Sequence, residues 1–155
     1  MKIIVLSCAL LLLTLLASFT ATAETSPAVL EKSMSDTLDL WRDGRFELLY
    51  DHLAHRGKTS REQFVNKMRN TSIKPACCFQ KMENFRVLNE KRTEATVYVK
   101  VGLEGAPNMT DSSTREFKLT HEENIWKLQL KDVFALAGVT GKNTRHNTFR
   151  KHTAY

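Results

Sequence analysis

The sequence predicts an α+β domain in which three N-terminal helices pack on one face of a four-stranded antiparallel sheet. Up to about residue 70, apolar residues recur at the three- and four-residue spacing of amphipathic helices. After Pro75 they recur at every second position, as in strands with one buried face. Because the helical part precedes the strand part, the helices are expected to cover the sheet from one side.

The first predicted helix begins at Pro27, with Ser26 as its N-cap, and ends at the pair Asp43 and Gly44. Proline is favoured in the first helical turn because its missing N–H group would have no partner there. One side of this helix carries the apolar residues Leu30, Met34, Leu38 and Trp41. The opposite side is polar, so the helix is expected to pack on the sheet through this apolar stripe.

Two further helices are predicted before Pro75. The second has apolar residues at positions i, i+3, i+4 and i+7 and ends at residues 56–58; these positions are Phe46, Leu49, Tyr50 and Leu53. The third is capped by Thr59 or Ser60, and Glu62 or Gln63 completes a capping box. Its short apolar face consists of Phe64, Val65 and Met68.

Four strands are predicted after Pro75, each from alternating apolar residues. Phe85 and Val87 mark the first strand. The other three are marked by Val97, Val99, Val101 and Leu103; by Phe117 and Leu119; and by Trp126, Leu128 and Leu130. Residues 122–124 separate the last two strands by a hairpin-length turn, which predicts antiparallel pairing.

The chain divides into three parts. Residues 1–23 are predicted to be a cleavable signal peptide, because Lys2 precedes an apolar run too short to span a bilayer and Ala21 and Ala23 provide a small-x-small cleavage pattern. Residues 24–137 form the predicted domain, which is expected to be exported to the periplasm or secreted. Residues 138–155 lack periodicity and are predicted to be a disordered or loosely docked basic tail.

The charge is concentrated in this tail. The chain has 23 basic and 17 acidic residues, and the tail carries no acid but four bases: Lys142, Arg145, Arg150 and Lys151. The folded part is therefore close to neutral, which disfavours a nucleic-acid-binding domain. The tail is expected to make only weak contact with an anionic surface, because each charge contributes at most about 1 kcal/mol there.

Beyond the signal peptide the cysteines are Cys77 and Cys78, which are adjacent. Two neighbours cannot build a paired-cysteine zinc site, and the absence of Cys-x-x-Cys spacing disfavours a redox enzyme. Three states stay open for them: structural thiols, bonds to another chain or transient bonds, and a vicinal disulfide. If they lay in a strand, their side chains would point to opposite faces.

Three segments resemble the nuclear transport factor 2-like superfamily: residues 40–46 (LWRDGRF), 59–64 (TSREQF) and 125–128 (IWKL). The resemblance covers roughly residues 28–136. It implies a cone of helices and curved sheet with an internal pocket, and dimerisation through the sheet. The superfamily includes isomerases, dehydratases, polyketide cyclases and members without known chemistry, so the fold alone selects no function.

The predicted function is that of an exported, non-catalytic domain that binds a small apolar ligand or a protein partner. Five residues are predicted to line the ligand site: Thr37, Trp41, Tyr50, Tyr98 and Trp126. No catalytic residue is predicted, because no inward carboxylate is paired with an inward His or Tyr, as acid–base catalysis would require. Neither a cofactor nor a metal site is expected.

Alternatives come from other functional classes. One is a small isomerase or dehydratase that uses Tyr50 or His121 as its acid or base. Another is surface binding driven by the basic tail. Asp51 and His55 are four residues apart, a spacing that a helical metal site could use, but they lie opposite the apolar stripe and are interpreted as a solvated surface.

Overall fold

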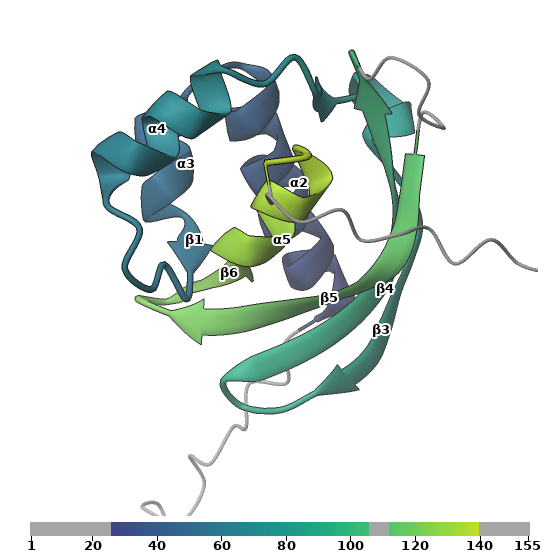
Figure 1. Cartoon of the computed structure of the whole chain (residues 1–155). Coiled ribbons are helices and arrows are strands. Elements are labelled where there is room, and N and C mark those ends of the chain that lie inside the picture. The colour runs from purple at the N-terminus through teal and green to yellow at the C-terminus, as the bar shows by residue number, and fades with distance from the viewer. Residues whose placement is uncertain (1–25, 106–111, 140–155) are drawn as a thin grey trace, which may run out of the picture.

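The structure, a computed structural model, describes residues 26–105 and 112–139. Helices pack against the concave face of a strongly curled mixed sheet, which forms a half-barrel (Figure 1). The predicted α+β class, with helices on a curved sheet, is therefore confirmed. The predicted signal peptide at residues 1–23, and the tail from residue 140 onward, lie outside the described residues. In the described part, no helix is both long and apolar enough to cross a membrane.

Two of the predicted helices begin as the sequence indicated. In α2 (Pro27–Arg42) the amide of Ala28 donates to the side chain of Ser26, and the four apolar stripe residues are buried. In α4 (Arg61–Arg69) Ser60 and Gln63 form a reciprocal capping box. These caps satisfy amide groups that a helix N-terminus otherwise leaves without partners.

The second predicted helix is shorter in the structure. It forms α3 (Phe46–Asp51), and the chain then enters a two-residue strand, β1 (Leu53–Ala54). Leu53 and Ala54 pair in parallel with Leu128 and Gln129, and both are fully buried. Leu53 is therefore buried as a strand residue and not, as its spacing suggested, as part of the apolar stripe of a helix.

The sheet has six strands rather than four and is not purely antiparallel. Its long strands are β3 (Met82–Glu90), β4 (Glu94–Glu104), β5 (Ser112–Glu122) and β6 (Ile125–Gln129). The short β1 and β2 (Lys74–Pro75) complete the order β1-β6-β5-β4-β2, while β3 also pairs with β4. The prediction of four antiparallel strands was wrong because strands of two residues are too short to show alternation.

The hairpin between β5 and β6 confirms the turn predicted at residues 122–124. Glu123 and Asn124 both have positive φ, at 54° and 63°. Two consecutive left-handed residues are the geometry of a type I′ hairpin, whose twist matches that of the strands. The hairpin places Leu128 opposite Leu119, so both side chains face the core.

A further helix, α5 (Leu130–Leu136), follows the last strand. The prediction that all helices lie N-terminal to the sheet, and that Leu130 ends a strand, was therefore wrong. Leu130, Val133 and Phe134 are spaced i, i+3 and i+4, and all three are buried. The ring of Phe134 stacks on that of Phe64 in α4, with centroids 5.5 Å apart. In Figure 1, α5 lies on the concave side of the sheet.

Candidate functional site

The structure does not gather the five predicted ligand-binding residues around one cavity. Trp41 in α2 is 2% exposed and, like Trp126 in β6, belongs to the hydrophobic core. Thr37 is also buried, and its hydroxyl donates to the carbonyl of Ser33 one helical turn earlier, at 2.9 Å. These three side chains are therefore engaged inside the protein.

Tyr50 and Tyr98 lie in different surroundings. The hydroxyl of Tyr50 donates to the carbonyl of Thr59 at 2.7 Å and ties α3 to the residue before the cap of α4. Tyr98 alternates along β4 with the fully buried Val97 and Val99, so it lies on the outer face of the sheet. Tyr98 and the buried core residues therefore lie on opposite faces of the sheet.

The residues weighed for other chemistry are also spread out. The ring of His121 packs on Trp126, with centroids 5.0 Å apart. Asp51 forms an ion pair with Arg61, and the ring of His55 lies 3.3 Å from the hydroxyl of Thr120. Among the residues that the structure describes, no three His, Cys, Asp or Glu side chains are placed to hold a metal ion.

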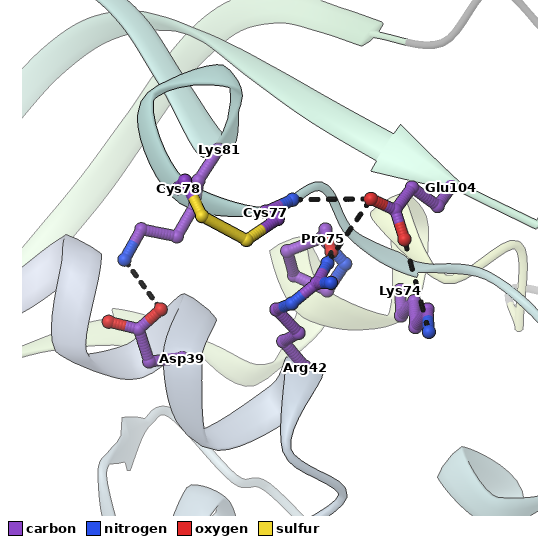
Figure 2. Close-up of a disulfide and its surroundings, with 8 residues drawn as sticks. All are labelled: Asp39, Arg42, Lys74, Pro75, Cys77, Cys78, Lys81 and Glu104. Atoms are coloured by element: carbon purple, nitrogen blue, oxygen red, sulfur yellow. Dashed lines mark hydrogen bonds and ion pairs between the residues drawn. A yellow bond between two sulfur atoms is a disulfide. The ribbon is translucent and has the colours of Figure 1, made fainter.

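Cys77 and Cys78 form a vicinal disulfide, one of the three states that the sequence left open (Figure 2). Both residues are exposed. Cys77 precedes a single turn of 3-10 helix, η1 (Cys78–Lys81), and Cys78 has a left-handed φ of 60°. Strand alternation does not separate their side chains, because neither cysteine lies in a strand.

The disulfide turn lies directly against the backbone of β4. The amide of Ala76 donates to the carbonyl of Gly102 at 2.9 Å. A Cβ atom added to Gly102 would lie 2.1 Å from the carbonyl oxygen of Gln80, which is closer than any real side-chain contact. Glycine at position 102 therefore allows the turn to rest on the strand.

A carboxylate links the turn to α2 and to β2. Glu104 in β4 accepts a hydrogen bond from the Cys77 amide at 3.2 Å, and it forms ion pairs with Arg42 at 3.2 Å and Lys74 at 3.9 Å (Figure 2). Partial burial raises the pKa of Glu104, but the hydrogen bonds from Arg42 and Cys77 and the two positive charges together lower it below its usual value. The carboxylate is thus held in its ionised form.

The other end of the turn is fixed by a buried lysine. The Nζ atom of Lys81 lies 2.5 Å from a carboxylate oxygen of Asp39 in α2 (Figure 2). Between the two anchors, Phe79 is 82% exposed, the most exposed of the large apolar side chains in the described part of the chain. The turn therefore presents an aromatic ring to solvent from a fixed position.

A cleft of about 510 Å³ adjoins the turn. It is lined by Ala76, Gln80, Glu83, Lys100, Gly102, Leu103, Glu104, Gly105 and Ser112. Its charges are paired, since Lys100 donates to Glu83 at 3.0 Å and Glu104 is held as described above. We refer to residues 76–81 together with this cleft as the turn–cleft site.

The concave face holds a carboxylate that sequence reasoning missed. Asp132, in the first turn of α5, is partly buried near Arg115 of β5. A guanidinium N–H of Arg115 donates to the backbone carbonyl of Asp132 at 3.0 Å, while the buried Nε atom of Arg115 has no hydrogen-bond partner in the described structure. Burial raises the pKa of Asp132, and the attraction of Arg115 and Lys131 offsets this in part. The helical spacing of Leu130, Val133 and Phe134 was the signal that could have revealed α5.

Comparison with protein-family models and with curated proteins gives no relative from which a role can be taken. No protein-family model matches this chain, and no curated protein matches it. The function is therefore inferred from the chemistry of its own side chains.

Proposed function

We propose that this chain is an exported, non-catalytic domain that binds a protein partner through the turn–cleft site. The observation that carries the proposal is the exposed ring of Phe79, held between the disulfide and the ion-paired Lys81. A rigid aromatic residue surrounded by polar groups is typical of the anchor residues that dominate binding energy in protein interfaces.

The charged groups of the cleft support binding rather than catalysis. Glu83 is paired with Lys100, and Glu104 is held by Arg42 and the Cys77 amide. A general acid or base must exchange a proton with its substrate at a pKa near the working pH. The lowered pKa of Glu104 makes it a poor candidate for that role. Both carboxylates can instead orient a partner's polar groups at the rim of an interface.

Export of the protein and its membership of a superfamily are both parts of this proposal. The composition of residues 1–23 predicts a signal peptide, and disulfides such as Cys77–Cys78 persist in oxidising compartments. Membership of the nuclear transport factor 2-like superfamily is likewise a proposal, supported by helices on the concave face of a curled sheet. Surface binding by the basic tail stays a prediction, since residues 140–155 lie outside the described part.

The alternative ligand, a small apolar molecule in the cone, has weaker support. Trp41 and Trp126, which were expected to contact it, pack in the core together with Phe64 and Phe117. A homodimer through the outer face of the sheet is a second form of partner. There Tyr98 lies between Arg86 and Glu116, whose opposite charges could pair with those of a copy related by a twofold axis.

The test is native mass spectrometry of the protein purified from its exported compartment, with two matched variants. Phe79→Ser removes the aromatic ring of the site, and Leu88→Ser removes another exposed apolar side chain, 52% exposed and located in β3. The wild type and Leu88→Ser should carry a partner protein that Phe79→Ser loses, with an affinity loss of roughly 30-fold or more for an anchor residue.

Three results would contradict the proposal: a bare wild-type monomer, equal partner retention by both variants, or a non-covalently bound molecule of low mass that depends on neither. The last result would favour the cone ligand instead. A dimer that Phe79→Ser leaves unchanged would assign the contact to another face of the molecule, such as the sheet.

A second candidate function, a small isomerase or dehydratase, is favoured by one observation. Asp132 is a partly buried carboxylate on the concave face, its pKa is raised by burial, and the Nε atom of Arg115 beside it has no partner in the described structure. A raised carboxyl pKa suits a general base, and an adjacent guanidinium suits a developing negative charge. Tyr50, the earlier candidate, is instead engaged with Thr59.

A further inference from the structure

Partner binding does not account for the exposed vicinal disulfide that Cys77 and Cys78 form. We propose that Cys77–Cys78 is an exchange site for low-molecular-weight thiols, and that its oxidation state sets the conformation of residues 76–81. This inference needs no bound partner, so it stands or falls separately from the proposed function.

The position of the disulfide in the chain argues against a role in global stability. A disulfide stabilises a fold mainly by restricting the unfolded chain, and the effect grows with the length of the loop that it closes. Cys77 and Cys78 are adjacent, so the loop is the shortest that a chain can form. Opening the ring should therefore leave the hydrophobic core intact and change only the conformation of the turn at residues 76–81.

The position of the disulfide on the surface makes exchange chemically accessible. Both cysteines are exposed, on the turn that joins β2 to β3 and lies close to Asp39 and Arg42 of α2 (Figure 2). Thiol–disulfide exchange requires a thiolate to approach one sulfur, and exposed disulfides are the labile, regulatory ones in proteins. A small thiol can reach Cys77–Cys78 without unfolding the domain.

The reaction balances with two equivalents of a small thiol, RSH. One thiolate attacks a sulfur of the disulfide, the S–S bond breaks, and the other cysteine leaves as a thiolate that takes a proton from water. A second thiolate attacks the small-thiol sulfur of the mixed disulfide and releases RSSR and the second cysteine. The protein disulfide gains two electrons, and the two thiols lose them.

The conformational consequence follows from the backbone of Cys78. Its φ of 60° lies in the left-handed region, which non-glycine residues seldom adopt without a constraint. The ring joins the side chains of both cysteines and thereby limits their backbones. Once the ring is open, Cys78 can relax to a negative φ, and this change rotates the peptide groups that follow it.

The anchors on either side confine the movement. Ala76 is held by its hydrogen bond to Gly102, and Lys81 by its ion pair with Asp39. The four residues between them include Phe79 and Gln80, one the exposed ring and the other a wall of the cleft. Reduction should therefore reshape the turn–cleft site and leave the rest of the fold in place.

The experiment exposes the full exported chain, without denaturant, to a graded series of glutathione and then of dithiothreitol. Alkylation followed by intact mass spectrometry counts the free thiols, and amide NMR spectra locate the change. We expect reduction to add two alkyl groups per chain, with amide shifts confined to residues 76–81 and their contacts Arg42, Gly102 and Glu104, and full reversal on reoxidation.

Two double variants separate the ring from the backbone. Cys77→Ser with Cys78→Ser should give the reduced-type spectrum whether or not thiol is present. Cys77→Ser with Cys78→Gly should stay closer to the oxidised spectrum, because glycine adopts positive φ readily. The proposal is overturned if the disulfide resists thiols until the protein unfolds, if reduction leaves the amides of residues 76–81 unchanged, or if the shifts spread through the core.

Discussion

The interior beneath α2 and the disulfide end of the sheet are held together by different kinds of interaction. The interior is lined by large apolar side chains such as Trp41, Phe64 and Phe117, all of them buried. At the disulfide end, one phenylalanine projects into solvent, and ion pairs, backbone contacts and a covalent ring determine the shape. The two regions share one sheet, since Phe117 lies on β5 and the turn rests on β4.

The two regions therefore contribute differently: the interior to the free energy of folding, and the disulfide end to the shape of the surface. Burial of apolar surface contributes about 25 cal/mol per Å², so the interior is expected to carry most of the folding free energy. Exposed ion pairs contribute at most about 1 kcal/mol each, so the disulfide end is expected to add little. What that end provides is a fixed surface, which is the property that recognition requires.

The largest test of this comparison substitutes the same residue type in both regions. Phe117→Ala should lower the free energy of unfolding by about 3–5 kcal/mol, because it opens a cavity in the core. Phe79→Ala should change it by less than about 0.5 kcal/mol, because the ring is already exposed. Urea unfolding of both variants against the wild type measures the difference. If both variants lost a similar free energy of unfolding, Phe79 would be packed against the protein in solution and could not serve as an exposed residue that binds a partner.

A smaller effect is expected where the two regions meet. Gly102→Ala places a methyl group against the carbonyl of Gln80, so the turn must lift from β4 at a cost of about 1–3 kcal/mol. Gly44→Ala is the control, since nothing lies near its added Cβ and it tests only the cost of a positive φ. Unfolding curves give the stabilities, and NMR shifts should appear at residues 76–81 for Gly102→Ala alone. Unperturbed turn amides in that variant would contradict the close packing.

The sequence could predict the elements whose signals are local. The N-caps at Ser26 and Ser60 and the hairpin turn at residues 122–124 depend on neighbouring residues, and all three agree with the structure. Strands β1 and β2 were missed because two residues are too short to alternate. Helix α5 was missed because Leu130 continued the alternation of β6 until the period changed.

The candidate site was harder to predict because its parts come from distant positions. The adjacent cysteines were visible in the sequence, but their exposure, and the approach of the turn to Gly102, arise only when residues 76–81 cross β4. Similarly, the sequence shows that Tyr98 carries a polar hydroxyl group. It does not show that Tyr98 lies on the outer face of the sheet, because this depends on which side of β4 the helices cover. Contacts of this kind are set by packing rather than by local spacing.

The smallest effects are expected at two carboxylates: Asp132 on the concave side of the sheet and Glu104 at the disulfide end. Burial raises the pKa of Asp132 above its ordinary value of 3.8, so this group favours the fold while protonated and disfavours it as pH rises through the folded pKa. Asp132→Asn stays neutral, so it should unfold like the wild type at about pH 3 and be more stable at about pH 7. We expect a gain below about 1 kcal/mol, because solvent screens a partly exposed carboxyl group.

Glu104→Gln should show the opposite sign. The pKa of Glu104 is lowered in the fold, so its contribution is complete above the unfolded value of 4.5 and is lost as pH falls through the folded pKa. This variant should therefore be less stable than the wild type near neutral pH and equal to it in acid. Urea unfolding across this pH range measures both variants. If Asp132→Asn instead lost stability at neutral pH, attraction to Arg115 would outweigh burial, and Asp132 would be a structural ion-pair partner rather than a candidate base on the concave face.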